Sequence, residues 1–238
     1  MRFACTVTAS VALTIPLVVA SPAQAATYSP LSERGLALSS LGAGDVPRWM
    51  SRGSTPEAKQ SFRTGIQASA PPVCLDQTGN FTEAKRARQS MESMVATREG
   101  KEVGSIIFQY RTRAAAERAW NDLISLAAQC QRRVALDLSA EGISTRTVVL
   151  TEVTRTRALF GTSGLTFFYD FNVVIDAFGS KFAFVGDSYV SYYLAGTSIT
   201  SVGFGSGTGT RGVGRVTRGF VDTMSIVVAQ RVERRSLS

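Results

Sequence analysis

The chain has 238 residues, of which 44% are hydrophobic and 18% charged, and its formal net charge is +8. This composition is that of a globular protein long enough to build one good-sized core. The chain contains no histidine, which excludes serine–histidine and cysteine–histidine catalysis and most zinc sites. The positive charge favours acidic partners, such as anionic envelope polymers or lipid head groups. Nucleic acid is not expected, because the arginines are scattered and no nucleic-acid motif accompanies them.

Residues 1–25 have the pattern of a signal peptide. Arg2 gives a positive start, residues 4–20 are mostly apolar, and Ala23-Gln24-Ala25 supplies the small residues of a cleavage site. Cys5 lies near the start of this segment, ahead of its most apolar part, so it is not expected to be the lipidated cysteine of a lipoprotein. The sequence therefore predicts a secreted, extracellular protein.

The expected mature chain starts near Ala26 with a short tail over residues 26–30. Residues 31–235 follow as a single domain, because neither a repeat nor a second domain boundary is evident. No later stretch of about 18 uncharged apolar residues is present, so the chain is not expected to span a membrane.

The first half of the domain contains few regular patterns. Residues 31–41 favour a short helix, and residues 52–70 are polar with little periodicity, which indicates an irregular connection. Residues 89–97 and 103–112 alternate between apolar and polar side chains across a turn, which predicts a β-hairpin.

The second half is more regular. Residues 113–130 carry an apolar stripe at helical spacing, and residues 214–234 form a second such pattern. Alternation predicts four strands between them, over residues 145–154, 165–176, 182–194 (with a possible break at Gly186-Asp187) and 197–204. The order predicts an α+β fold: a largely antiparallel sheet with two main amphipathic helices packed on one face.

Cys74 and Cys130 are the two cysteines that remain once Cys5 is removed with the signal peptide. A pair of cysteines in an oxidising compartment predicts a disulfide bond. A redox role is not expected, since no CxxC spacing is present.

Asp170 and Asn172 are the candidate ligand contacts on the most regular strand. They share its polar face with Asp176, and alternation alone predicts that such a face meets solvent. If that face lines a cleft instead, these side chains contact a ligand.

Tyr189 and Tyr193 share one face of the next strand. They are either core residues or an exposed surface on which a ligand stacks.

Arg211 and Arg215 flank the start of the last helix, where free amides and arginines together favour an anion. Residues 207–212 fit GxGxxG, but no strand follows that helix, so a dinucleotide site is not expected. No metal or cofactor is predicted.

Several spaced features resemble those of one family. They are a leucine-rich opening with the turn Gly44-Asp45-Val46-Pro47, Cys74, a strand ending at Tyr110, a helix from Ala114 through Trp120 to Cys130, and Gly186-Asp187-Ser188. Together they resemble the extracellular sensor-like domains of actinobacterial surface proteins, such as those of PknH-type serine/threonine kinases. The resemblance implies an α+β domain with a ligand cleft and no catalysis, and Gly186-Asp187-Ser188 as a turn. One cysteine pair, where two are expected in the kinases, and the absence of a kinase domain favour a freestanding secreted module.

The expected function is that of a secreted, non-enzymatic binding module that holds a small ligand, a lipid or a cell-envelope component in a cleft, and the positive charge of the chain favours an anionic one. The alternatives are a protein–protein interaction or inhibitor module without a small ligand, and a hydrolase that uses carboxylates in place of histidine.

Overall fold

The structure is a computed structural model that describes residues 26–47, 50, 58–96, 102–137, 139, 143–205 and 214–237. The expected signal peptide, the GxGxxG pattern and Arg211 lie outside these residues.

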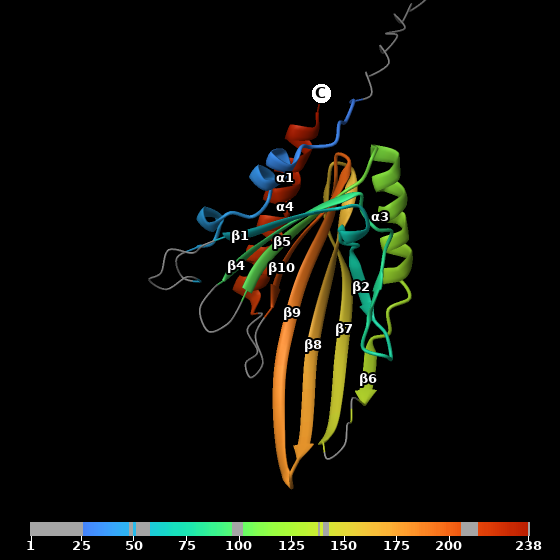
Figure 1. Ribbon diagram of the computed structural model, residues 1–238, viewed down its shortest axis with the longest axis vertical. Helices are drawn as coiled ribbons and strands as arrows, with labels where there is room; N and C mark the ends of the chain where they lie inside the picture. The colour runs from blue at the N-terminus through green and yellow to red at the C-terminus, as the bar shows by residue number, and fades with distance from the viewer. Residues whose placement is uncertain are drawn as a thin grey trace, which may run out of the picture.

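The fold is α+β and is built on a large antiparallel sheet of eight strands in the order β1-β4-β5-β10-β9-β8-β7-β6 (Figure 1). The strands are β1 (Ala58–Thr64), β4 (Gln89–Ala96), β5 (Glu102–Gln109), β6 (Arg133–Asp137), β7 (Ile143–Leu159), β8 (Thr162–Ala177), β9 (Ser180–Ala195) and β10 (Ser198–Gly205). A small second sheet pairs β2 (Pro72–Leu75) with β3 (Phe81–Glu83). The described helices are α1 (Glu33–Ser39), α3 (Arg113–Ala127) and α4 (Arg215–Ser236), with 3-10 turns at Ala43–Asp45 and Gly65–Gln67.

Helix α3 confirms the clearest helical pattern in the sequence. Thr112 caps it, because its side-chain oxygen accepts a hydrogen bond from the backbone N–H of Ala115. Its buried stripe contains Ala116, Trp120 and Leu123, and these side chains pack on the sheet. The expected apolar face is therefore the face that the helix buries.

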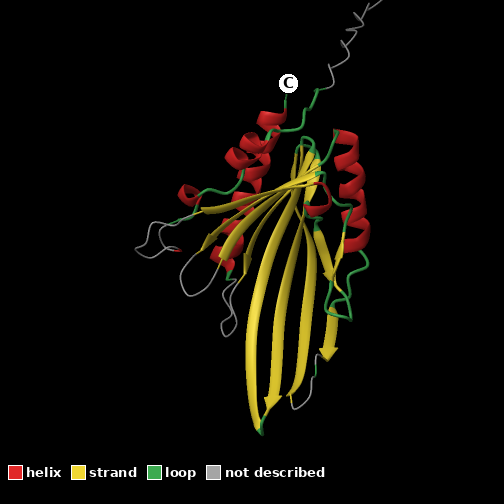
Figure 2. Cartoon of the chain, viewed as in Figure 1, coloured by secondary structure: helices red, strands yellow, loops and turns green. Residues whose placement is uncertain are grey.

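The two main helices pack on opposite faces of the sheet, so the prediction that both cover one face is wrong (Figure 2). Helix α3 packs on the face that carries Tyr192 and Leu194, and we call this the α3 face. Helix α4 packs on the face that carries Tyr193 and Ala195, the α4 face. Over these residues strand β9 is apolar on both faces, so each face has to be buried by a different helix.

Strand β1 lies within residues 52–70, which the sequence predicts to be irregular. It is an edge strand that pairs only with β4 among the described strands, and most of its side chains are exposed. Because its position depends on pairing with a distant strand and not on its own apolar pattern, local periodicity does not reveal it.

Gly186-Asp187-Ser188 lies inside the continuous strand β9, paired with β8 throughout. The break and the turn expected there are therefore wrong. The structure departs from the family resemblance at this position.

The predicted short tail, residues 26–30, is held by the C-terminal helix. Tyr28 forms a β-bridge with Leu237, and its hydroxyl donates a 2.5 Å hydrogen bond to Glu233 Oε1. The backbone N–H of Ser29 donates to the carbonyl of Ser236 at 2.8 Å. The first and last described segments of the chain are thus side by side.

Candidate functional site

An apolar cleft of about 380 Å³ lies on the α3 face, over the part of β4, β5, β10 and β9 that α3 does not cover. This volume falls within the range of about 300 to 1,000 Å³ that is typical of small-ligand sites. The apolar side chains that line it come from Pro72, Met94, Ile106, Val190 and Tyr192. These side chains come from four strands, and β10 adds further lining residues, so the cleft offers an apolar group a surface assembled from five strands.

The floor of the cleft is formed by Gly104, Gly203 and Gly205. Gly104 and Gly203 are directly paired across β5 and β10, and Gly205 is two residues further along the same face. A Cβ atom on Gly104 would collide with Met94 Sδ, whereas one on Gly205 would meet open space. The absence of side chains along this row is the reason why the sheet is hollow here.

One wall of the cleft is fixed by a hydrogen bond between two segments distant in sequence. The hydroxyl of Tyr192 donates to the carbonyl of Pro72 at 3.0 Å, and burial raises the pKa of Tyr192. The Tyr192 ring also lies edge-on to Phe167, with ring centroids 5.6 Å apart. This wall is consequently preformed.

Polar groups lie at the margin of the cleft. Glu102 and Ser188 line it, and Ser201 donates a 3.3 Å hydrogen bond to the carbonyl of Ile106. An apolar body with a few polar groups beside it fits a ligand that has an apolar part and a polar end.

Two other hollows of similar size have different surroundings. One, of about 410 Å³, lies between α3 and the β7–β8 hairpin and is lined by Arg113, Trp120 and Arg155. Arg113 already donates to Glu117 Oε1 at 2.9 Å and to the carbonyl of Gly196 at 3.0 Å. The other, of about 500 Å³, lies beside Cys74 and is lined mainly by polar side chains.

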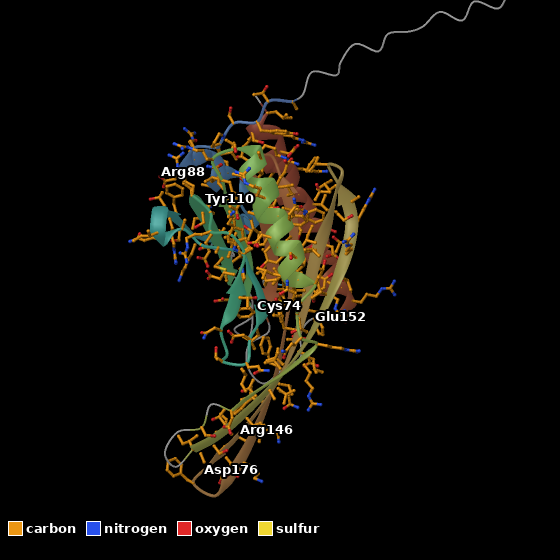
Figure 3. The ribbon with its side chains drawn as sticks, turned by 90° about the vertical axis from the view of Figure 1, so that its right-hand side faces the viewer. Cys74, Arg88, Tyr110, Arg146, Glu152 and Asp176 are labelled. Atoms are coloured by element: carbon orange, nitrogen blue, oxygen red, sulfur yellow. A yellow bond between two sulfur atoms is a disulfide. The ribbon has the colours of Figure 1, made fainter. Side chains whose placement is uncertain are left out.

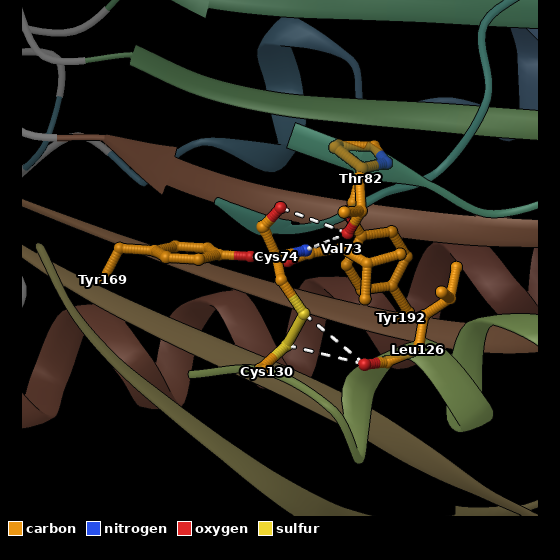
Figure 4. The surroundings of a disulfide bond; sticks show 8 residues. Val73, Cys74, Thr82, Leu126, Cys130, Tyr169 and Tyr192 are labelled. Carbon is orange, nitrogen blue, oxygen red and sulfur yellow. Dashed lines mark hydrogen bonds between the residues drawn. A yellow bond between two sulfur atoms is a disulfide. The ribbon is translucent and has the colours of Figure 1, made fainter. Parts of the chain in front are cut away.

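The predicted disulfide between Cys74 and Cys130 is confirmed. The two Cα atoms are 5.4 Å apart, and the bond joins β2 to the segment that follows α3 (Figure 4). Close to it, the hydroxyl of Tyr169 donates to the carbonyl of Val73. Since Pro72 lies on the same strand, the disulfide also holds one edge of the cleft.

Tyr189 and Tyr193 are core residues and do not line the cleft. Tyr193 is 1% exposed, and its hydroxyl shares a 2.9 Å hydrogen bond with Thr156. Tyr189 is 8% exposed and donates to Asp222 at 3.0 Å. Of the two alternatives, core residues or an exposed stacking surface, the structure shows the first for both, because α4 covers the face on which they lie.

A cation–π contact strengthens this packing. The Arg218 guanidinium lies 4.1 Å from the centroid of the Phe168 ring and 5.6 Å from that of Tyr189. Burial, followed by the nearby Asp222 carboxylate, raises the pKa of Tyr189 to about 12. Burial also raises the pKa of Asp222, against the hydrogen bond from Tyr189 and the charge of Arg218. This cluster holds α4 on the sheet, and the sequence gives no local signal for it.

Asp170 and Asn172 lie on the α4 face of β8, on the opposite side of the sheet from the cleft. Asp170 pairs in register with Asp187, which is buried, and both side chains have interaction partners. Asn172 is exposed further along the strand. The structure therefore does not bring these two candidates to the cleft.

Arg215 is exposed as the first residue of α4. Its expected partner in anion binding, Arg211, lies outside the described residues. The resemblance implies a ligand cleft, but none of the residues that line this one is among the predicted site residues. The recurrence of glycine in residues 203–205 is the only local sign of it.

Searches against protein-family models and against curated proteins find no match for this chain. No helix in the described part of the chain is long and apolar enough to cross a membrane. Among the described residues, no group of three or more histidine, cysteine, aspartate and glutamate side chains is placed to hold a metal ion.

Proposed function

We propose that this protein is a secreted, non-enzymatic binding module that holds an apolar small ligand, such as a single acyl chain, in the glycine-floored cleft on the α3 face. The observation that carries the proposal is the hollow above Gly104, Gly203 and Gly205, with an apolar lining and polar groups beside it. An envelope lipid or a lipid-like metabolite has this combination of an apolar chain and a polar end.

Secretion is supported by two independent features. The first is the charged, apolar and small-residue pattern of residues 1–25. The second is the disulfide between Cys74 and Cys130, a bond that persists in oxidising compartments. The resemblance to extracellular sensor-like domains agrees with both, since those domains imply a ligand cleft outside the cell.

The proposal is tested by filling the cleft. Gly205→Leu places a side chain above the glycine floor, where a Cβ meets no atom within 4 Å, so the variant is expected to fold. Gly219→Leu is the matched control, because it adds the same side chain at an exposed position of α4 where a Cβ also meets open space. The probe is a fluorescent fatty acid, whose emission rises on transfer from water to an apolar site.

The wild-type protein and Gly219→Leu are expected to bind the fatty acid with similar affinity. Gly205→Leu is expected to bind it at least about tenfold more weakly, because the side chain occupies the space of several methylene groups. Equal binding by all three proteins would contradict the proposal, as would a wild-type protein that binds no probe and carries no ligand in native mass spectrometry from its original host.

A further inference from the structure

The ends of the three longest strands project beyond the helices as a separate β-finger. It consists of residues 143–149 of β7, 171–177 of β8 and 180–186 of β9, paired in continuous register, and residues 134–137 of β6 pair along the outer edge of β7. Figure 3 shows Arg146 and Asp176 on this projection, far from α3 and from the disulfide. The β9–β10 ladder ends at Ser188 and Gly205, before the finger begins.

The end of the β-finger is rich in exposed apolar side chains. Four of the eleven exposed large hydrophobic residues of the described chain lie there. Phe178 forms the turn, Phe182 lies on the α3 face, Val174 lies on the α4 face, and Ile143 lies in the last paired position of β7. The apolar surface therefore surrounds the tip on several sides.

Phe178 is exposed in an unfavourable backbone conformation. Its side chain is 92% exposed and its φ is 51°, in the left-handed region that bulky residues avoid. With Gly179 at φ 78°, it completes a two-residue hairpin loop whose first position normally holds Asn, Asp or Gly. Both solvation and conformation disfavour phenylalanine here, and strain of this kind is often found where a residue has a function.

Two cations and two anions lie behind the tip. Lys181 and Asp176 face each other with 3.8 Å between Nζ and Oδ2. Arg146 is paired in register with Asp137 of the neighbouring strand β6. At about 3.3 Å per residue, this group is some 7 to 13 Å from the turn. That separation is comparable to the 5 to 10 Å to which peripheral segments enter a bilayer, so these charged side chains reach the level of the polar head groups.

We propose that the β-finger inserts its tip into the surface of a lipid bilayer, with Phe178 at the deepest point and Lys181 and Arg146 at the level of the polar head groups. A bilayer covers the turn and both faces of the finger together. A single partner strand added along β9, including that of a second copy, would leave Phe178 and Val174 in water. The contact is peripheral and does not depend on what the cleft binds.

Co-sedimentation with vesicles of phosphatidylcholine and phosphatidylglycerol tests the proposal. Phe178→Asn removes the apolar tip and also suits the turn, so the variant should fold. Phe160→Asn is the matched control, because Phe160 also has a φ of 51° and precedes glycine in a two-residue loop, but at the opposite end of β8. The wild type and Phe160→Asn are expected to bind the vesicles equally, and Phe178→Asn on the order of tenfold more weakly.

A second measurement reports on insertion directly. Phe178→Trp is expected to bind like the wild type, with blue-shifted tryptophan emission that bilayer-embedded quenchers reduce. Equal binding of Phe178→Asn and wild type, or no binding of either, overturns the proposal. A concentration-dependent dimer that Phe178→Asn abolishes, without vesicle binding, overturns it in favour of a second copy. Gly205→Leu should retain vesicle binding, which separates this proposal from that for the cleft.

Discussion

Arg231 and Asp45 form a bidentate ion pair, with hydrogen bonds of 2.8 Å from Nη1 to Oδ2 and 2.7 Å from Nη2 to Oδ1. Arg231 belongs to α4, and Asp45 ends the 3-10 turn that follows α1. The Asp45 carboxylate also accepts a 2.8 Å hydrogen bond from the backbone N–H of Gly42. The pair thus joins the N-terminal segment to the C-terminal helix.

Asp45→Asn is expected to lower the free energy of unfolding at neutral pH by about 1.5 to 3 kcal/mol, the usual contribution of hydrogen bonds to charged groups. The hydrogen bonds from Arg231 hold the pKa of Asp45 below its usual value, with burial opposing them. The stabilisation is therefore complete above the unfolded pKa of about 3.9 and is lost as pH falls through the lower folded pKa.

Urea unfolding of wild type and Asp45→Asn at several pH values measures this difference. It should shrink below about pH 4. Asp176→Asn serves as the control, since Asp176 is in an exposed ion pair at 3.8 Å and should contribute little. A difference that stays constant down to strongly acidic pH would show that the ion pair is not its source.

Reduction of the disulfide between Cys74 and Cys130 is expected to destabilise the protein by about 4 kcal/mol, because the bond closes a loop of 56 residues. Thermal unfolding with and without reductant measures the effect, and intact mass should show a loss of about two hydrogens on oxidation. A Cys74→Ala, Cys130→Ala variant is the control and should not respond to reductant. Two free alkylatable thiols in the native protein would contradict the bond.

The buried tyrosines are expected to ionise only at high pH. Burial raises the pKa of Tyr189 to about 12 and also raises those of Tyr110, Tyr169 and Tyr192. A raised pKa means that the neutral forms stabilise the fold fully below about pH 10, and that this contribution is lost as pH rises through the folded values.

Tyrosinate absorbance during an alkaline titration measures these pKa values, with the same titration in guanidinium chloride as the reference. The tyrosines of the native protein should ionise at a clearly higher pH than those of the denatured reference, and unfolding should accompany their ionisation. If all the tyrosines of the native protein titrate near pH 10, the assignment of Tyr189 and Tyr192 to the core is wrong.

Phe160→Asn and Phe178→Asn are each expected to raise the free energy of unfolding by about 1 kcal/mol, because asparagine tolerates the left-handed conformation better than phenylalanine. Chemical denaturation measures both variants. Phe182→Asn is the contrasting change, since Phe182 lies in regular strand and gains no such relief. If Phe160→Asn and Phe178→Asn both destabilise the protein, the turn geometry does not govern these positions.

The sequence is most informative for elements whose own residue pattern determines whether they form a helix or a strand. The alanine-rich stripe predicts α3, alternation predicts most of β8, and two remaining cysteines predict the disulfide. The placement of α4 could not be predicted, because β9 is apolar on both faces and either face could receive the helix. The cleft arises from Gly104 and Gly203, which lie on strands that pair across a hundred residues of sequence.

Tyr189 and Tyr193 also show what a sequence pattern leaves undecided. Their spacing places them correctly on one face of β9, but spacing does not say whether a helix covers that face. Only the contact of Arg218 and Asp222 with Tyr189, made from the last helix of the chain, decides between core and surface.

The position of helix α4 in the chain has a consequence for folding during synthesis. The helix follows all eight strands of the large sheet in the chain, and until it is made the buried residues of the α4 face, among them Tyr193 and Val202, have no cover from it. A growing chain therefore carries a bare apolar sheet face until α4 is made. We expect such a chain to need protection by chaperones during this interval, and products truncated before α4 to aggregate.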